Sequence, residues 1–219
     1  MNARPTLARP GLLLMDMDST LIQCECIDEI ADFAGLKDKV AAITERAMRG
    51  ELDFAASLKA RVALLEGLPV EVLAQVWRER VRLSPGAEAL VEGLHAHGWV
   101  VGVVSGGFRY FTDRLQKTLG LDFARANELE IQGGRLTGRV RGPIIDAEGK
   151  RAVLLEEARA RGIPVAQTVA VGDGANDIPM LKAAGLGVAF HAKPAARAAA
   201  DVCIDNGGLD RVLELLEGA

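Results

Sequence analysis

Four aspartates follow closely on two short apolar runs, where carboxylates can meet a ligand. The runs and their aspartates are Leu12–Met15 with Asp16 and Asp18, and Thr168–Val171 with Asp173 and Asp177. Burying an unpaired carboxylate costs several kcal/mol, so these side chains belong beyond the strands rather than inside them. Several carboxylates around one point need a cation, and oxygen ligands alone suit a hard ion. The pattern predicts a Mg²⁺ site whose shell a phosphate completes.

Each pair of aspartates also has an ordinary interpretation. Asp16 and Asp18 are compatible with a solvated turn after a strand, and Asp173 with an Asx-type turn. A third polar motif, Ser105–Gly106–Gly107, ends the apolar run Trp99–Val104. Because parallel strands share a direction, the polar ends of all three runs fall at one edge of a sheet. This convergence favours a common site over separate turns.

The runs themselves indicate the fold class. Unbroken apolar runs are typical of strands buried on both faces of a parallel sheet. Helical patterns separate them, including one from Lys150 to Arg161, and a hairpin is expected between Phe123 and Ile145. Strands that alternate with helices predict an α/β protein with a doubly wound parallel sheet.

One stretch departs from this alternation. Residues 22–82 show only helical spacing, with four apolar faces, the first three ended by Gly35, Gly50 and Gly67. We expect a helical cap subdomain at 22–82, inserted into an α/β core made of 1–21 and 83–219.

Composition and charge restrict the class of protein. The chain has 219 residues, of which 49% are hydrophobic and 26% charged, the balance of a globular protein. A net charge of −4 argues against a nucleic-acid binder, which needs a basic face. We expect a small-molecule substrate, no nucleic acid, and a monomer or homodimer.

Cysteine usage and the N-terminal segment bear on the compartment. Cys24, Cys26 and Cys203 lack the spacing of a disulfide framework or a zinc site. The apolar run before Asp16 is too short for a signal peptide or a membrane span. We expect a cytoplasmic protein without membrane attachment. Because few residues precede Asp16, we expect no regulatory domain in front of it.

Taken together, the motifs resemble those of the haloacid dehalogenase (HAD) superfamily of phosphohydrolases. They are D-x-D-S-T at Asp16–Thr20, S-G-G at Ser105–Gly107, a lone Lys150, and G-D-G-x-N-D at Gly172–Asp177. The resemblance covers nearly the whole chain and is nearest to members that hydrolyse O-phospho-L-serine. It implies a HAD-like Rossmannoid core with a helical cap, and the last step of serine biosynthesis.

The resemblance implies a role for each carboxylate. Asp16 would be the nucleophile that forms an aspartyl-phosphate. Asp18 would protonate the leaving hydroxyl and then activate water, which requires a raised pKa. Mg²⁺ would be held by Asp16, Asp173 and the main-chain carbonyl of Asp18.

The remaining motif residues are assigned around the phosphoryl group. Ser105, Gly106 and Lys150 would bind its oxygens. Asn176 and Asp177 would orient the metal's waters or Lys150, with Asn176 also on the substrate side and Asp177 behind the metal ligands. Without the resemblance, a lysine at a helix start is a solvated surface residue.

The cap would select the substrate. The resemblance implies that Glu25 binds the substrate ammonium and that Arg61 binds the substrate carboxylate. The planar guanidinium of arginine can form two parallel hydrogen bonds to a carboxylate, and a glutamate carboxylate accepts hydrogen bonds from an ammonium. Met48 and Phe54 would form an apolar wall, although they also suit the ordinary core of the cap helices. Glu25 and Arg61 likewise suit a solvated helix face.

Three functions are weighed on these residues. The first is hydrolysis of O-phospho-L-serine. The second keeps the same intermediate but transfers the phosphoryl group to homoserine, or acts on another small phosphomonoester. The third, more remote, is a receiver-like signalling domain, which has no need of Asp18 or of the helical insertion.

Overall fold

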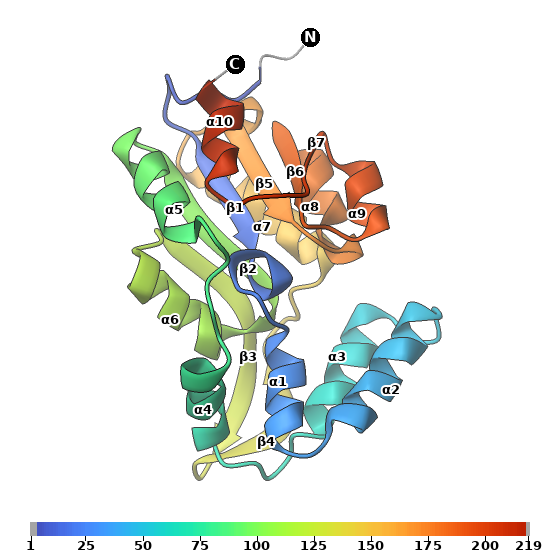
Figure 1. Ribbon diagram of the computed structural model, residues 1–219. Helices are drawn as coiled ribbons and strands as arrows, with labels where there is room; N and C mark the ends of the chain where they lie inside the picture. Colours follow the sequence, from blue (N-terminus) through green and yellow to red (C-terminus); the bar gives the residue numbers. More distant parts are fainter. Residues whose placement is uncertain (1–3, 218–219) are drawn as a thin grey trace.

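A seven-stranded sheet forms the centre of the molecule. The computed structural model describes residues 4–217, apart from the side chain of Met48, and Figure 1 shows its arrangement. The strands are β1 (Leu12–Asp16), β2 (Val100–Phe108), β3 (Phe123–Gln132), β4 (Arg135–Arg141), β5 (Thr168–Gly172), β6 (Leu186–Phe190) and β7 (Val202–Ile204). Their order is β4-β3-β2-β1-β5-β6-β7. All neighbours pair in parallel except β3 and β4.

Helices cover both faces of the sheet, which explains the unbroken apolar runs. In β1, Leu13 and Met15 pack into one apolar core and Leu12 and Leu14 into the other. Helices α5 (Ala87–Ala96), α6 (Arg109–Leu119) and α10 (Arg211–Glu217) contribute to the first core, which also extends into the helices between β1 and α5. Helices α7 (Ala147–Ala160), α8 (Ile178–Ala183) and α9 (Pro194–Ala199) contribute to the second. The predicted doubly wound α/β sheet is confirmed. None of the helices within residues 4–217 has the length and apolar character that crossing a membrane requires.

The chain between β1 and α5 is helical, and its helices lie in the lower part of Figure 1, beside the β3–β4 hairpin. Its helices are α1 (Cys26–Phe33), α2 (Lys37–Met48), α3 (Phe54–Ala63) and α4 (Glu71–Glu79). Helices α1 and α2 end two residues before Gly35 and Gly50, and the turn that follows α3 ends at Gly67; each of these glycines has a positive φ. Glycine adopts this left-handed conformation without the cost that a Cβ brings. The three glycines therefore mark the ends of these helices in the sequence.

The β3–β4 hairpin reaches from the sheet to the helical insertion. The Leu136 N–H donates to Leu68 O (2.9 Å), and the Gly67 N–H donates to Leu136 O (2.8 Å). The Val70 N–H donates to Gly134 O (2.9 Å). The hairpin was expected from its alternating pattern, but its contact with residues 67–70 was not, because pairing between distant segments leaves no local signal.

Two boundaries differ from the sequence prediction. Strand β2 does not stop at Ser105 but continues through the glycines to Phe108, with an irregular register against β3. Helix α7 begins at Ala147, since the Asp146 side chain accepts a hydrogen bond from Gly149 N (2.9 Å) and caps it. Lys150 therefore lies one turn inside the helix rather than at its start.

Candidate active site

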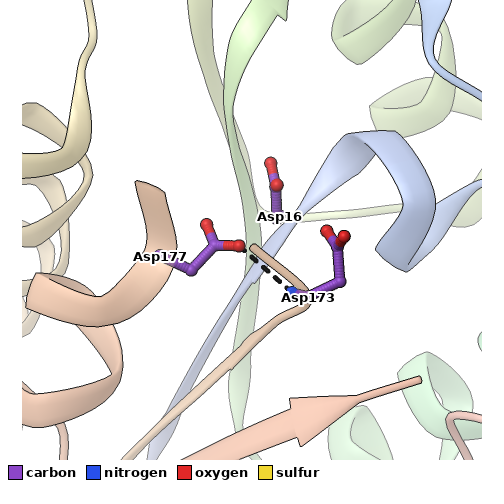
Figure 2. A group of neighbouring side chains, drawn as sticks. All are labelled: Asp16, Asp173 and Asp177. Atoms are coloured by element: carbon purple, nitrogen blue, oxygen red, sulfur yellow. Dashed lines mark hydrogen bonds between the residues drawn. The ribbon is translucent and has the colours of Figure 1, made fainter. Parts of the chain in front are cut away.

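Three buried carboxyl groups converge at the carboxyl edge of the sheet. Asp16 ends β1, Asp173 follows β5, and Asp177 ends the short helical turn η3 (Ala175–Asp177). Figure 2 shows the three side chains around one point. One oxygen of each lies within 4.8 Å of the others, and the residues are 4%, 5% and 0% exposed. The parallel register of β1 and β5 produces this meeting, as the sequence predicted.

Lys150 places a positive charge next to two of these three aspartates. Its Nζ lies 2.8 Å from Asp16 Oδ1 and 2.7 Å from Asp177 Oδ1, and the side chain is 1% exposed. Burial alone would lower the pKa of Lys150, but the two carboxylates outweigh it and raise the pKa above its ordinary value. Lys150 is thus a fixed cation that binds the Asp16 carboxylate.

Asp177 shapes the loop that carries Asp173. Its Oδ2 accepts hydrogen bonds from the backbone N–H groups of Asp173 (3.1 Å) and Gly174 (3.0 Å), while Oδ1 accepts from Lys150. A Cβ at Gly172 would lie 2.5 Å from Asp177 Cγ, so only glycine admits this approach. The G-D-G-x-N-D motif thus builds a loop in which Asp177 is fully bonded within the protein.

The donor set fits a hard divalent cation. Burial raises the pKa of both Asp16 and Asp173, so their ionised forms need positive charge nearby. Lys150 offers one buried charge against the three carboxylates of Figure 2. Both carboxylate oxygens of Asp177 already accept hydrogen bonds within the protein, from Lys150 Nζ and from the backbone N–H of Asp173. Asp16 and Asp173 are therefore the carboxylates best placed to bind an ion through oxygen.

Asp18 has the proton affinity of an acid–base group. It is partly buried, and its Oδ1 accepts a hydrogen bond from Cys26 N (3.1 Å). Burial, with a further contribution from the Glu25 carboxylate, raises the pKa of Asp18 to about 7. A carboxyl group with this pKa can give up and take back a proton near neutral pH.

The turn after β1 brings Glu25 toward the aspartates. Ser19 adopts a left-handed backbone conformation (φ 56°) within η1 (Met17–Leu21), which is costly for a residue with a side chain. Its N–H donates to Cys24 O (3.2 Å), and its hydroxyl donates to Glu25 Oε1 (2.7 Å). The reversal between the sheet and α1 is therefore fixed from both sides, and it orients the Glu25 carboxylate.

A small cavity of about 110 Å³ lies between the aspartates and the helical insertion. Pockets for drug-sized ligands measure about 300–1,000 Å³, so this cavity suits a small metabolite. Most of the residues predicted from the sequence line it, namely Asp16, Asp18, Glu25, Phe54, Arg61, Ser105, Gly106, Asp173 and Asn176. Lys150 and Asp177 lie behind its wall, bonded to each other.

Glu25 and Arg61 keep their charges available to a ligand. Both line the cavity, and neither takes part in an ion pair among residues 4–217. Arg61 Nε donates to Ser57 O (3.4 Å), a weak hydrogen bond within α3. Partial burial lowers the pKa of Arg61, opposed by Asp28 and Glu25. The cavity thus presents one anionic and one cationic group from the helical insertion, beside the aspartates.

The Ser105–Gly107 segment and α3 meet across the cavity. A Cβ at Gly106 would lie 2.6 Å from Phe54 Cζ, so the ring packs where a side chain would otherwise stand. Ser105 is buried, and its Oγ accepts a hydrogen bond from Gly107 N (2.8 Å). That N–H is therefore engaged within the segment, while Phe54 covers the cavity as an apolar wall.

Some residues lie differently from the prediction, and others were missed. Met48 closes α2, and its side chain lies outside the described part of the structure. Lys150 bonds to Asp177, and no hydrogen bond joins it to Asn176 among the described residues. Sequence reasoning missed Asn127, whose side chain links β2 to the loop before α7. Its Nδ2 donates to Gly106 O (2.8 Å), and its Oδ1 accepts from Ile145 N (2.7 Å).

Lys193 was also missed. It lines the cavity, and its Nζ lies 3.3 Å from Asp173 Oδ2. The residue stands in a loop after β6, where no periodicity or motif distinguishes it from a surface lysine. A search for positive charge after each parallel strand would have found it.

Comparison with known proteins adds independent information. Residues 13–182 match the family model described as haloacid dehalogenase-like hydrolase. A phosphoserine phosphatase of Streptomyces coelicolor is 58% identical over 94% of this chain and 50% of its own length. One from Polaromonas sp. is 54% identical over 94% of this chain and 89% of its own. A solved structure described as a phospho-aspartyl intermediate analogue of phosphoserine phosphatase is 44% identical, with a TM-score of 0.89, covering 95% of this chain and 100% of the other.

The similarity extends over almost the whole of the chain, the helical insertion included. The relatives themselves differ in length, and this chain spans only half of the Streptomyces coelicolor protein.

Proposed function

Because this chain belongs to the haloacid dehalogenase-like hydrolase family, we propose that it is a Mg²⁺-dependent phosphatase that hydrolyses O-phospho-L-serine. The observation that carries the proposal is the division of the cavity between two kinds of group. Asp16, Asp18 and Asp173 line it from the carboxyl edge of the sheet, whereas Glu25 and Arg61 line it from the helical insertion, without ion-pair partners among the described residues. A phosphoester of a small amino acid complements both kinds of group at once.

In the first step Asp16 attacks phosphorus. A bond forms between its carboxylate oxygen and the phosphorus, and the ester bond to the serine oxygen breaks. The leaving serine oxygen takes the bonding electron pair and a proton from Asp18. The pKa of Asp18, raised to about 7 by burial, lets it hold that proton beforehand.

In the second step water removes the phosphoryl group. Asp18, now ionised, takes a proton from water as the water oxygen attacks phosphorus. The bond between phosphorus and the Asp16 oxygen breaks, which releases inorganic phosphate and restores the Asp16 carboxylate. One residue thus serves both proton transfers, and its proton count returns to the starting value.

The other residues position the reacting groups. Lys150, whose Nζ lies 2.8 Å from Asp16 Oδ1, would fix the Asp16 carboxylate. Ser105 and Gly106, which line the cavity from β2, would bind the phosphoryl oxygens. We assign the ion to Asp16, Asp173 and the main-chain carbonyl of Asp18, with Mg²⁺ as its identity. When bound, Mg²⁺ supplies positive charge that lets a carboxylate and a phosphate dianion approach each other.

The helical insertion would select the substrate. Glu25 would accept the substrate ammonium and Arg61 would bind its carboxylate, with Phe54, Met48 and Asn176 completing the enclosure. We propose 22–82 as this cap and 1–21 with 83–219 as the core. The hydrogen bonds of residues 67–70 to the β3–β4 hairpin support a cap anchored to the sheet at its far end.

We propose the cytoplasm as the compartment and a monomer or homodimer as the working form. Three free cysteines, Cys24, Cys26 and Cys203, suit a reducing environment. Serine biosynthesis would then use the product directly.

A phosphate-release assay tests the function. The purified chain is incubated with O-phospho-L-serine and with O-phosphoethanolamine, which lacks the carboxylate, each with Mg²⁺ or with chelator. We expect Mg²⁺-dependent release with a strong preference for O-phospho-L-serine. Equal rates on the two esters would contradict the substrate assignment.

A second arm of the assay adds homoserine as an acceptor. Formation of O-phosphohomoserine at the expense of free phosphate would make the chain a phosphotransferase that uses the same Asp16 intermediate. We expect free phosphate instead, because relatives 54–58% identical to this chain are phosphoserine phosphatases. A stable phosphorylated protein with no turnover would indicate a receiver-like role.

A further inference from the structure

Lys193 lines the cavity next to the cluster of Asp16, Asp173 and Asp177. The loop that follows β6 carries it, and the preceding His191 adopts a left-handed backbone conformation (φ 45°). The Lys193 N–H donates to Asp173 O (2.8 Å), which ties this loop to the G-D-G loop. The Lys193 Nζ then reaches back to the same residue, 3.3 Å from Asp173 Oδ2. The backbone contact is fixed, so the position of the ammonium near Asp173 follows from the fold.

The two lysines of the site differ in their freedom to move. Lys150 is 1% exposed and bonds to two buried carboxylates. The Lys193 side chain is 68% exposed and contacts one carboxylate. Moving Lys150 would leave two buried carboxylates without their shared cation, whereas Lys193 can turn its largely exposed ammonium into solvent and leaves only Asp173 without this partner.

Asp173 is also one of the two carboxylates best placed to hold the divalent ion. The cluster of Asp16, Asp173 and Asp177 brings its oxygens within 4.8 Å. A divalent ion bound there would stand close to the Lys193 ammonium, and like charges at such distances repel strongly. The lysine and the ion therefore compete for the same carboxylate.

We propose that Lys193 is an exchangeable counter-ion of the metal site. Its ammonium neutralises Asp173 while no divalent ion is bound, and it swings away when the ion binds. The inference rests on the metal site of the proposed function, but it assigns to Lys193 a part that the hydrolytic steps do not use. Lys193 thereby weakens the affinity for the ion while it protects the metal-free carboxylates from repelling each other.

Titration calorimetry with MgCl₂ and no substrate tests this role. Full-length protein stripped of metal is compared with Lys193→Met, which keeps the length of the side chain but removes its charge. An ion pair whose cation is largely exposed shifts an equilibrium by only about a few-fold, so we expect Lys193→Met to bind Mg²⁺ about two- to five-fold more tightly.

Two matched variants accompany the measurement. Lys193→Arg retains a cation and is expected to keep the wild-type affinity. Lys182→Met removes the same charge from the exposed face of α8, outside the cavity, and is expected to leave the affinity unchanged. Thermal unfolding in chelator should show Lys193→Met slightly less stable than wild type and confirm that it folds.

The outcomes separate this inference from the function it rests on. If wild type binds Mg²⁺ and Lys193→Met binds it equally or more weakly, the counter-ion role is wrong, and weaker binding would make Lys193 a residue that orients Asp173 for the ion. If wild type binds no Mg²⁺, both the metal site and the role of Lys193 are wrong.

Discussion

The two sides of the cavity are built in opposite ways. On the sheet side, Asp16, Lys150 and Asp177 are buried and bonded to one another at 2.7–2.8 Å. On the helical side, Glu25 and Arg61 are partly exposed, and no ion pair among the described residues includes either. In the proposed function, the chemistry would thus depend on a buried, internally bonded network at the strand ends, whereas selection of the substrate would fall to groups without ion-pair partners.

This difference predicts how substitutions behave. A change on the sheet side should remove the reaction for every phosphoester, because it alters groups that all substrates share. A change on the helical side should alter the ranking of substrates and leave the reaction itself possible. The predictions below test that separation.

The largest effect is expected from Asp16→Asn. Loss of the nucleophile should reduce kcat by about four orders of magnitude or more, equally for O-phospho-L-serine and O-phosphoethanolamine. Steady-state phosphate release measures it, and circular dichroism checks the fold. Asp38→Asn, on the exposed surface of α2, is the matched control and should retain full activity. Appreciable turnover by Asp16→Asn would remove Asp16 from the mechanism.

Removal of the divalent ion should also act on every substrate. Chelator is expected to reduce phosphate release to background, and excess Mg²⁺ to restore it, because Asp16 and Asp173 are buried and need a compensating charge. Full activity in chelator would show that Lys150 alone neutralises the site.

Arg61→Ala should change specificity more than chemistry. A charged hydrogen bond to a carboxylate contributes enough that kcat/KM for O-phospho-L-serine should fall by about 10- to 100-fold. The value for O-phosphoethanolamine, which has no carboxylate, should hardly change. Arg78→Ala, an exposed arginine of α4 in the same insertion, serves as the control.

Glu25→Gln provides the complementary test. It should weaken O-phospho-L-serine more than 2-phosphoglycolate, which carries a carboxylate but no ammonium, whereas the loss of the Glu25 contribution to the pKa of Asp18 is common to both esters. If Arg61→Ala or Glu25→Gln depressed all the esters equally, the division between the two sides of the cavity would be wrong.

The smallest effect concerns stability of the metal-free protein. Burial raises the pKa of Asp18 from 3.8 to about 7 in the folded state, so between these values the folded protein binds more protons than the unfolded chain. The free energy of unfolding should therefore decrease as pH rises from 4 toward 7, by at most about 1.4 kcal/mol per pH unit from this group.

Asp18→Asn removes that contribution. Urea denaturation in chelator at pH 5, 6 and 7 should show a flatter dependence for the variant than for wild type. Parallel curves for the two proteins would mean that Asp18 has an ordinary pKa and cannot store the proton that the first step needs.

The sheet side could be predicted from the sequence because its signals are local. Strands buried on both faces leave unbroken apolar runs, and Asp16, Asp173 and Asp177 follow such runs directly. Parallel pairing then brings them together without further information.

The remaining features depend on contacts between distant segments. Lys193 reaches Asp173 only because the loop after β6 returns to the G-D-G loop. The hairpin contact with residues 67–70 and the continuation of β2 past Ser105 are of the same kind. The start of α7 is an exception, because Asp146 three residues before Gly149 is a capping signal that the sequence contains.

Rapid-quench labelling tests the central claim most directly. The enzyme is mixed with O-phospho-L-serine that carries a labelled phosphoryl group, quenched in acid within one turnover, and digested for mass spectrometry. The account predicts an acid-stable, base-labile phosphoryl group on Asp16, absent from Asp16→Asn. Hydrolysis with no labelled protein, or with the label on another residue, would contradict it.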